Sequence, residues 1–183
     1  MNYIAFFRGI NVGSKNRIKM ADLRVLFSDL GYQNVKTYIQ SGNVIFESNR
    51  PETMIMSELA RAFVERFGFE SKIVLRTAEE FATILAEFPF TEAEIQKMND
   101  HLPEVEHVYF YLGNQEIDAS AVAKLAEEFV GQDKVFVGKR EIYFLSAQSI
   151  RNSKLGNKLT KLDDSFTVRN RKTLNKISEL LTS

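Results

Sequence analysis

The chain has 183 residues, of which 44% are hydrophobic and 26% charged, and its 24 basic side chains balance 24 acidic ones. A chain of this size buries roughly 70% of its unfolded surface, so it can form one domain or two small ones. The absence of Cys excludes a disulfide framework, a thiolate nucleophile and a cysteine zinc site. No apolar run approaches the roughly 20 residues of a membrane span, and residues 1–7 lack the basic flank of a signal peptide. We therefore expect a cytoplasmic protein that does not engage a membrane.

The first half of the chain predicts the order strand, helix, strand, strand, helix, strand, helix. Strands are expected at residues 3–7, 35–40, 44–47 and 72–76. The helices are indicated by apolar residues at helical spacing: Leu23, Leu26, Phe27 and Leu30, then Met56, Leu59, Ala60, Phe63 and Phe67, then Phe81, Ile84, Leu85 and Phe88. Gly31 and Gly68 mark helix ends, and Thr77 with Glu80 forms a capping box.

The second half repeats this order. Strands are expected at residues 107–112, 134–137, 141–145 and 166–169. The helices carry Val122, Leu125, Ala126 and Phe129, then Leu155, Leu159 and Leu162, then Leu174, Ile177 and Leu181. Asp118 and Asn170 are placed to cap the first and last of them. Between the halves, Thr91 and Glu94 begin a short acidic helix.

A repeated strand–helix–strand–strand–helix–strand unit predicts an α+β fold, a tandem duplication of the ferredoxin-like βαββαβ unit. Each unit is expected to be a four-stranded antiparallel sheet with helices on one face and the order fourth, first, third, second strand. We divide the chain into a first half at 1–88, a connector at 89–105 and a second half at 106–183. Arg76 and Arg169 are expected at equivalent strand-to-helix corners.

The second face of each sheet needs a cover. Residues 3–7 are apolar at every position, so both faces of that strand should be buried. The simpler interpretation is that the two halves, or two chains, bury these faces together. The alternative is an aromatic row for base stacking in the second half, formed by His107, Tyr109, Tyr111 and Tyr143, although the RNA-recognition signature is absent.

Charge is unevenly distributed along the chain. Residues 1–50 hold seven Lys or Arg against three Asp or Glu, residues 51–128 six against sixteen, and residues 129–183 eleven against five. A fold that brings the basic ends together would carry a positive patch suited to anions or nucleic acid. The alternative is that acidic and basic parts neutralise each other.

Residues 8–19 form the segment most typical of a binding site. They contain four cationic side chains, no acid, and two glycines that allow backbone N–H groups to turn toward an anion. The spacing of Gly9, Gly13 and Lys15 is not that of a P-loop. The alternative is a solvated loop in which the glycines only make turns.

Two motifs carry a family resemblance. Residues 7–13 read Phe-Arg-Gly-Ile-Asn-Val-Gly, residues 37–44 read Thr-Tyr-Ile-Gln-Ser-Gly-Asn-Val, and further matches fall at residues 153–155 and 167–170. The chain closely resembles a large bacterial family known as domain of unknown function 1697. The resemblance implies a duplicated ferredoxin-like fold in a cytoplasmic protein, with no established activity. Relatives usually carry Gly in place of Ser14 and Trp in place of Arg171.

Polar residues at strand ends and in turns are the best candidates for binding. The candidate ligand-binding residues are Arg8, Asn11, Gly13, Lys15, Asn16, Lys19, Gln40, Ser41, Asn43, Lys154, Lys158, Arg169 and Asn170. We expect Arg8, Lys15 and Lys19 to converge with Lys154, Lys158 and Arg169 on one cleft for a phosphate-bearing ligand, either a nucleotide or a nucleic acid.

Catalytic residues are not identified. Ser41 lacks a nearby base, because His101 and His107 lie in the other half. With two His and no Cys we expect no metal centre, and nothing predicts a cofactor. Two alternatives to a binding protein stay open: an enzyme that uses Arg, Lys and Asn for electrostatic catalysis, and a structural oligomer such as a homodimer.

Overall fold

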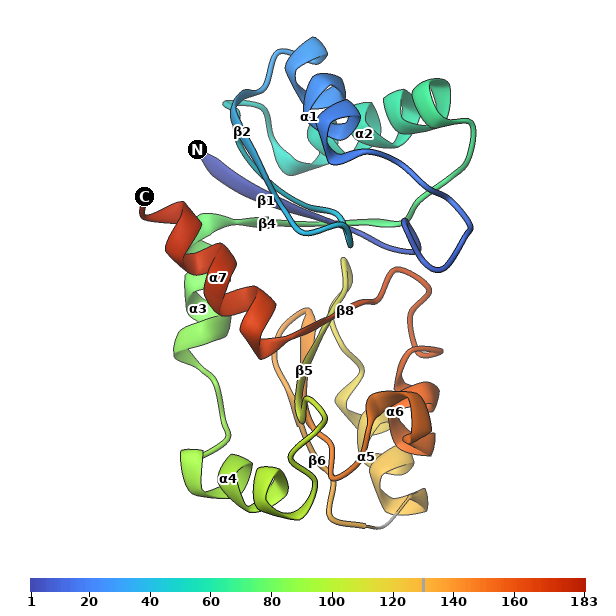
Figure 1. The fold of residues 1–183 in the computed structure, drawn as a ribbon, viewed down its shortest axis with the longest axis vertical. Coiled ribbons are helices and arrows are strands. Elements are labelled where there is room, and N and C mark those ends of the chain that lie inside the picture. Colours follow the sequence, from blue (N-terminus) through green and yellow to red (C-terminus); the bar gives the residue numbers. More distant parts are fainter. Residues whose placement is uncertain (130) are drawn as a thin grey trace. The chain divides into compact units, whose positions relative to one another are not determined.

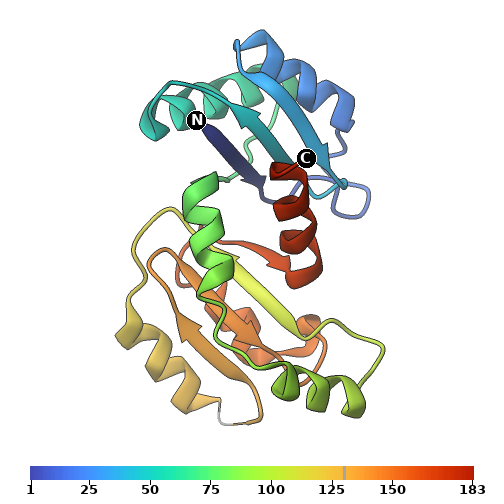
Figure 2. The same cartoon turned by 90° about the vertical axis from the view of Figure 1, so that its left-hand side faces the viewer.

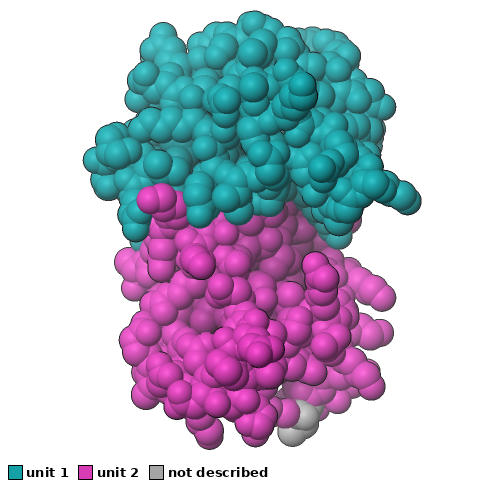
Figure 3. All heavy atoms as spheres, in the orientation of Figure 1, with its two compact units in different colours: residues 1–83, 177–183 teal, residues 84–176 magenta. Residues whose placement is uncertain are grey.

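The computed structural model describes residues 1–129 and 131–183 (Figure 1). These residues form two compact units, which Figure 3 shows in different colours. Unit 1 comprises residues 1–83 and 177–183, and unit 2 comprises residues 84–176. The domain boundaries drawn from the sequence stay a prediction.

Unit 1 contains one four-stranded antiparallel sheet. Its strands are β1 (Asn2–Phe7), β2 (Gln33–Tyr38), β3 (Asn43–Glu47) and β4 (Ile73–Thr77), in the order β2-β3-β1-β4. Its helices are α1 (Met20–Asp29), α2 (Glu52–Phe67), most of α3 (Ala78–Ala86) and the end of α7 (Arg171–Leu181). The predicted strand order is confirmed, and the capping box between Thr77 and Glu80 is present.

Strand β1 is buried on both faces, as its apolar sequence predicts. Tyr3, Ala5 and Phe7 belong to the core that includes residues of α1 and α2, which cover one face of the sheet (Figures 1 and 2). Ile4 and Phe6 point to the other face and are fully buried. There the ring of Phe6 lies 6.2 Å from that of Phe81 in α3.

Unit 2 repeats this topology. Its strands are β5 (Val108–Leu112), β6 (Lys134–Val137), β7 (Glu141–Leu145) and β8 (Thr167–Asn170), in the order β6-β7-β5-β8. Its helical elements are α4 (Glu92–His101), α5 (Ala119–Glu128), η1 (Ile150–Asn152), α6 (Lys154–Leu159) and most of α7. The two matching sheets confirm the fold class, a tandem duplication of a ferredoxin-like unit.

Helix α6 is shorter than its apolar pattern predicts. Leu155 and Leu159 are buried, whereas Leu162 lies beyond the helix and is 39% exposed. The backbone N–H groups of Lys161 and Leu162 each bond the carbonyl three residues earlier, which tightens the chain after residue 159. The prediction that Leu162 belongs to this helix is therefore wrong.

The second face of the unit 2 sheet is covered by the segment that precedes β5. The ring of Phe88 stacks 5.9 Å from that of Phe110, and Phe90 contacts Phe88 and Phe136. The hydroxyl of Tyr143 donates a 2.8 Å hydrogen bond to the carbonyl of Ile84. The residues between α3 and α4 therefore form part of the core of unit 2.

The predicted aromatic row does not exist as one surface. Tyr143 pairs with Phe110 across β5 and β7, so it lies on the opposite face from Tyr109 and Tyr111. Tyr111 is fully buried beneath α5 and α6, and its hydroxyl donates to the carbonyl of Gly156. Base stacking on this row is excluded because its rings point to two faces and His107, Tyr111 and Tyr143 are buried.

Candidate functional site

Residues 8–19, which we call the basic finger, form an ordered hairpin in unit 1. The backbone N–H of Asn11 donates to the carbonyl of Asn16 at 3.0 Å, and that of Lys15 donates to Val12 at 3.2 Å. The side-chain amide of Asn16 donates to the carbonyl of Gly9. These bonds fix the shape of an exposed loop that is outside the apolar core over most of its length.

Positive φ angles make the finger turn sharply. Gly13 has φ of 59°, while Asn11 and Asn16 have φ of 53° and 51°. Asn tolerates this left-handed region better than most residues because its short side chain bonds the local backbone. Gly13 and Asn16 therefore shape the finger, which is the turn-making role left open by the sequence.

Asn11 connects the finger to the turn between β2 and β3. Its side-chain nitrogen donates to the carbonyl of Gln40 at 2.8 Å, and its side-chain oxygen accepts a 2.8 Å bond from the backbone N–H of Ile18. Both ends of the amide are thus used within unit 1. Asn11 positions the site by joining two segments that lie 29 residues apart in sequence.

The β2–β3 turn, residues 39–42, is tightly constrained. Ile39 has φ of 50°, which is a rare conformation for a β-branched residue, and its side chain is 46% exposed. Gly42 has φ of 86°, and a Cβ placed there would lie 2.9 Å from the Cβ of Phe7 and overlap Ile10. Backbone strain of this kind is often found at functional sites.

A depression of about 480 Å³ lies where the finger meets this turn. Its lining residues are Asn11, Arg17, Ile18, Lys19, Met20 and Gln40. The lining includes two cations and no acidic side chain. Helix α1 begins at the edge of this depression, and no side chain caps its N-terminus, so its dipole adds to the positive potential.

The structure brings together only part of the predicted unit 1 set. Asn11, Lys19 and Gln40 line the depression, while Gly13, Lys15 and Asn16 belong to the finger. Ser41 and Asn43 bond each other, and the Asn43 amide also donates to the carbonyl of Tyr38, which makes them turn residues. Arg8 lies at the base of the finger, where its backbone bonds Lys72 and Ser71.

Arg17 lines the depression although the sequence does not predict it as a ligand-binding residue. Its guanidinium donates a 3.0 Å bond to the carbonyl of Gly13, which holds the side chain along the finger. The signal that could have identified it is its place among the four cations of an acid-free loop. Its neighbours Ile18 and Met20 supply the apolar part of the lining.

The predicted unit 2 residues are described within their own unit. Lys154 and Lys158 are exposed on α6, and Lys154 lines a depression of about 360 Å³ in that unit. Arg169 is only 9% exposed and donates to the carbonyl of Val168, and burial lowers the pKa of its guanidinium to about 10. Asn170 caps α7 by accepting from the backbone of Thr173. Convergence of this set with the basic finger stays a prediction.

Arg76 and Arg169 do occupy equivalent corners. Arg76 pairs with Ile4 across β1 and β4, and Arg169 pairs with Phe110 across β5 and β8. Both are buried, and each guanidinium donates to the carbonyl of the preceding residue, at 2.9 Å for Arg76 and 3.1 Å for Arg169. This repeated contact supports a duplication and shows that both arginines are buried on the edge strand of their sheet.

Arg171 follows this corner and covers an aromatic ring. Its guanidinium carbon lies 4.3 Å from the centre of the Phe88 ring, and its NH2 group forms a 2.8 Å ion pair with Glu92. A planar guanidinium can stack on an aromatic face. The ion pair also lowers the pKa of the Glu92 carboxyl.

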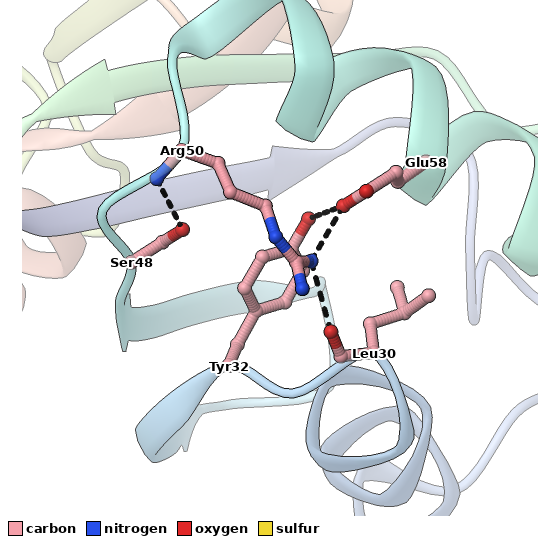
Figure 4. A network of polar contacts seen from close by, with 5 residues as sticks. All are labelled: Leu30, Tyr32, Ser48, Arg50 and Glu58. Atoms are coloured by element: carbon pink, nitrogen blue, oxygen red, sulfur yellow. Dashed lines mark hydrogen bonds and ion pairs between the residues drawn. The ribbon is translucent and has the colours of Figure 1, made fainter.

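A polar network in unit 1 serves stability (Figure 4). Glu58 accepts hydrogen bonds of 2.7 Å from the Tyr32 hydroxyl and from Arg50, and Arg50 also donates to the carbonyl of Leu30. Burial, together with the bond to Glu58, raises the pKa of Tyr32. The network joins the end of α1 to α2.

Carboxylate side chains line another depression in unit 2, which has a volume of about 440 Å³. Glu116, Asp118, Asp163 and Asp164 line it, but Asp118 caps α5 and Asp163 accepts from the backbone of Ser165. Across residues 1–129 and 131–183, no group of three or more His, Cys, Asp or Glu side chains is arranged to hold a metal ion. None of the described helices is both long and apolar enough to cross a membrane.

These features define a duplicated ferredoxin-like α+β protein with a basic depression in its first unit. The family described as Protein of unknown function (DUF1697) matches residues 1–143, and the chain belongs to this family. A solved structure, described as the conserved bacterial protein SP0830 from Streptococcus pneumoniae, is similar, with a TM-score of 0.72 and 23% identity over 98% of each chain. This likeness shows the fold. The comparison with curated proteins finds no match.

Proposed function

We propose that this protein binds a phosphate-bearing ligand in the depression between the basic finger and the β2–β3 turn. The observation that carries the proposal is the lining itself, in which Arg17 and Lys19 face a shared hollow without an acidic side chain. Asp22, the acid in the first turn of α1, is not among the lining residues. A cationic hollow of this kind attracts anions.

The two cations suit different parts of a phosphate. A guanidinium can donate two parallel hydrogen bonds to phosphate oxygens, whereas an ammonium acts as a point charge. The uncapped N-terminus of α1 contributes partial positive charge at the same edge. Ile18 and Met20 offer apolar surface beside these groups, so the ligand we propose has an organic part as well as a phosphate.

The hydrogen bonds of the finger support binding rather than stability alone. A solvated loop with no ligand gains little from a fixed shape, yet Asn11 and Asn16 hold this one through three side-chain bonds. A preorganised site loses less conformational entropy when a ligand binds. We also propose a cytoplasmic location, because a chain without cysteine gains nothing from an oxidising compartment.

A thermal-shift screen with inorganic phosphate, sugar phosphates and nucleotides tests this proposal. A ligand at 100 times its dissociation constant stabilises a protein by roughly 2.7 kcal/mol, which corresponds to a rise in Tm of about 5–10 °C. Replacing both Arg17 and Lys19 by Gln should abolish the rise. The control is Lys124→Gln, an exposed lysine of α5, which should leave it unchanged.

Two results would contradict the proposal. The first is that no phosphate-bearing compound raises Tm, and the second is that the Arg17→Gln, Lys19→Gln double variant responds as the parent does. Chemical turnover of a stabilising ligand would place the protein among enzymes. Concentration-dependent self-association without any ligand response would instead favour a structural oligomer.

A further inference from the structure

We propose that the ligand is a single-stranded nucleic acid, an inference that rests on the proposed function and narrows its ligand class. The positive charge extends beyond the depression. Lys15 lies at the turn of the finger, exposed and outside the lining, whereas Arg17 and Lys19 lie in it. A ligand with one phosphate in the depression would leave Lys15 unused, while a polyanion can contact all three cations.

The cations repeat along the chain as a polyanion requires. Arg17 and Lys19 are exposed, and Ile18 between them is buried, so the two cations project from the same side of the segment. Lys19 has an extended backbone, with φ of −84° and ψ of 138°. Alternating residues of an extended segment present their side chains in a row. This row of two cations fits neighbouring phosphates of a nucleic-acid backbone.

Exposed apolar side chains flank this row. Val12 is 66% exposed and Ile39 is 46% exposed, and each adjoins one partner of the hydrogen bond between Asn11 and Gln40. Apolar groups beside cations match unpaired bases, whose faces are apolar and lie beside phosphates. In a duplex the base faces are hidden in the stack. The position of Val12 and Ile39 therefore favours a single strand over a duplex.

The absence of acidic side chains from the finger and from the β2–β3 hairpin agrees with this ligand. Residues 8–19 and 36–46 contain no Asp or Glu, so nothing in them repels a phosphate backbone. Gln40 lines the depression, and its side-chain amide can donate to and accept from a base edge. An acidic peptide would share the negative charge but not the flat apolar faces, so we use one as a competitor in the test.

Fluorescence anisotropy measures the binding of a labelled single strand of about 12 nucleotides at several salt concentrations. Three phosphate contacts predict a slope of log affinity against log salt of about −2, because each contributes about −0.7 on a single strand. Lys15→Gln should make the slope shallower by about 0.7. Val12→Ser should weaken binding at least about threefold without changing the slope.

Val25→Ser is the matched control, because Val25 is 48% exposed on α1, and it should bind as the parent does. The inference is overturned if a nucleoside monophosphate binds as tightly as the strand, or if a duplex or polyglutamate does. In the first case the proposed function survives with a small ligand. If neither the strand nor any phosphate compound binds, both the inference and the proposed function are wrong.

Discussion

Asn11 and Gln40 are joined by a 2.8 Å hydrogen bond from a side-chain amide to a backbone carbonyl. This bond ties the basic finger to the β2–β3 turn, and the same amide accepts from the backbone of Ile18. The lining of the depression therefore depends on one side chain that bonds both the end of the finger and the β2–β3 turn. Asn11 contributes to the site by positioning it.

Replacing Asn11 tests this positioning role. Asn11→Gly keeps the positive φ and removes both side-chain bonds, so we expect the free energy of unfolding to fall by about 1–3 kcal/mol. Asn11→Ala should cost about 1–2 kcal/mol more, because Ala is strained in the left-handed region. Urea unfolding measures both values. Parent-like stability in Asn11→Gly would mean that the amide does not hold the finger.

Gly42 should be sensitive to a single methyl group. At φ of 86° a Cβ would be strained and would also press against Ile10 and Phe7, so Gly42→Ala should lower the free energy of unfolding by about 2–4 kcal/mol. Gly68 has φ of 78° but open space around it. Gly68→Ala is thus the matched control, with an expected loss of about 1 kcal/mol. Equal losses in the two variants would show that the turn has room to adjust.

The hydroxyl of Tyr143 should stabilise unit 2. Tyr143→Phe leaves the carbonyl of Ile84 without its buried donor, and we expect a loss of about 1–3 kcal/mol in the free energy of unfolding. Tyr109→Phe is the control, because Tyr109 is half-buried and lies on the other face of β5. Chemical denaturation of the two variants compares them. A larger loss in Tyr109→Phe would contradict this assignment.

The topology could be predicted from the sequence because periodicity is local. The continuous apolar run at residues 3–7 and the helical spacing around Leu23 indicate which elements form, and right-handed crossovers then restrict the strand order. Faces were harder. The alternative of an aromatic row groups Tyr143 with Tyr109 and Tyr111, whereas it lies on the opposite face of the sheet. Residues on a strand alternate between faces, so a difference of one position in register moves a side chain to the other face.

The site was predicted less completely than the fold. An acid-free loop with two glycines is visible in the sequence, and it located the basic finger. The hydrogen bond from the Asn11 side chain to Gln40 cannot be predicted from the sequence. It forms only because the β2–β3 hairpin places Gln40 next to the finger. Ser41 and Asn43 stay predicted binding residues, and their hydrogen bonds to each other and to Tyr38 also shape the turn.

The pKa of Glu94 tests whether its carboxylate pairs with Lys134. Its bond to Lys134, together with the backbone of Thr91, lowers the pKa of the Glu94 carboxyl from 4.5 to about 2. Because the folded pKa is lowered, its stabilising contribution is present above the unfolded pKa and is lost as the pH falls toward 2. In Lys134→Gln we expect the pKa of Glu94 to rise toward 4.5. NMR titration of the side-chain carboxyl carbon measures it, and an unchanged value would show that the pair does not form.

The most direct test of a phosphate site in unit 1 is an NMR titration of the ¹⁵N-labelled full chain with a nucleoside monophosphate. Amide shifts locate binding without assuming any activity. We predict that the perturbed amides cluster at residues 11–20 and 39–42, and that the Arg17→Gln, Lys19→Gln double variant loses them while Lys124→Gln keeps them. Shifts confined to other residues, or the same shifts in the double variant, would contradict the assignment of the ligand to this depression.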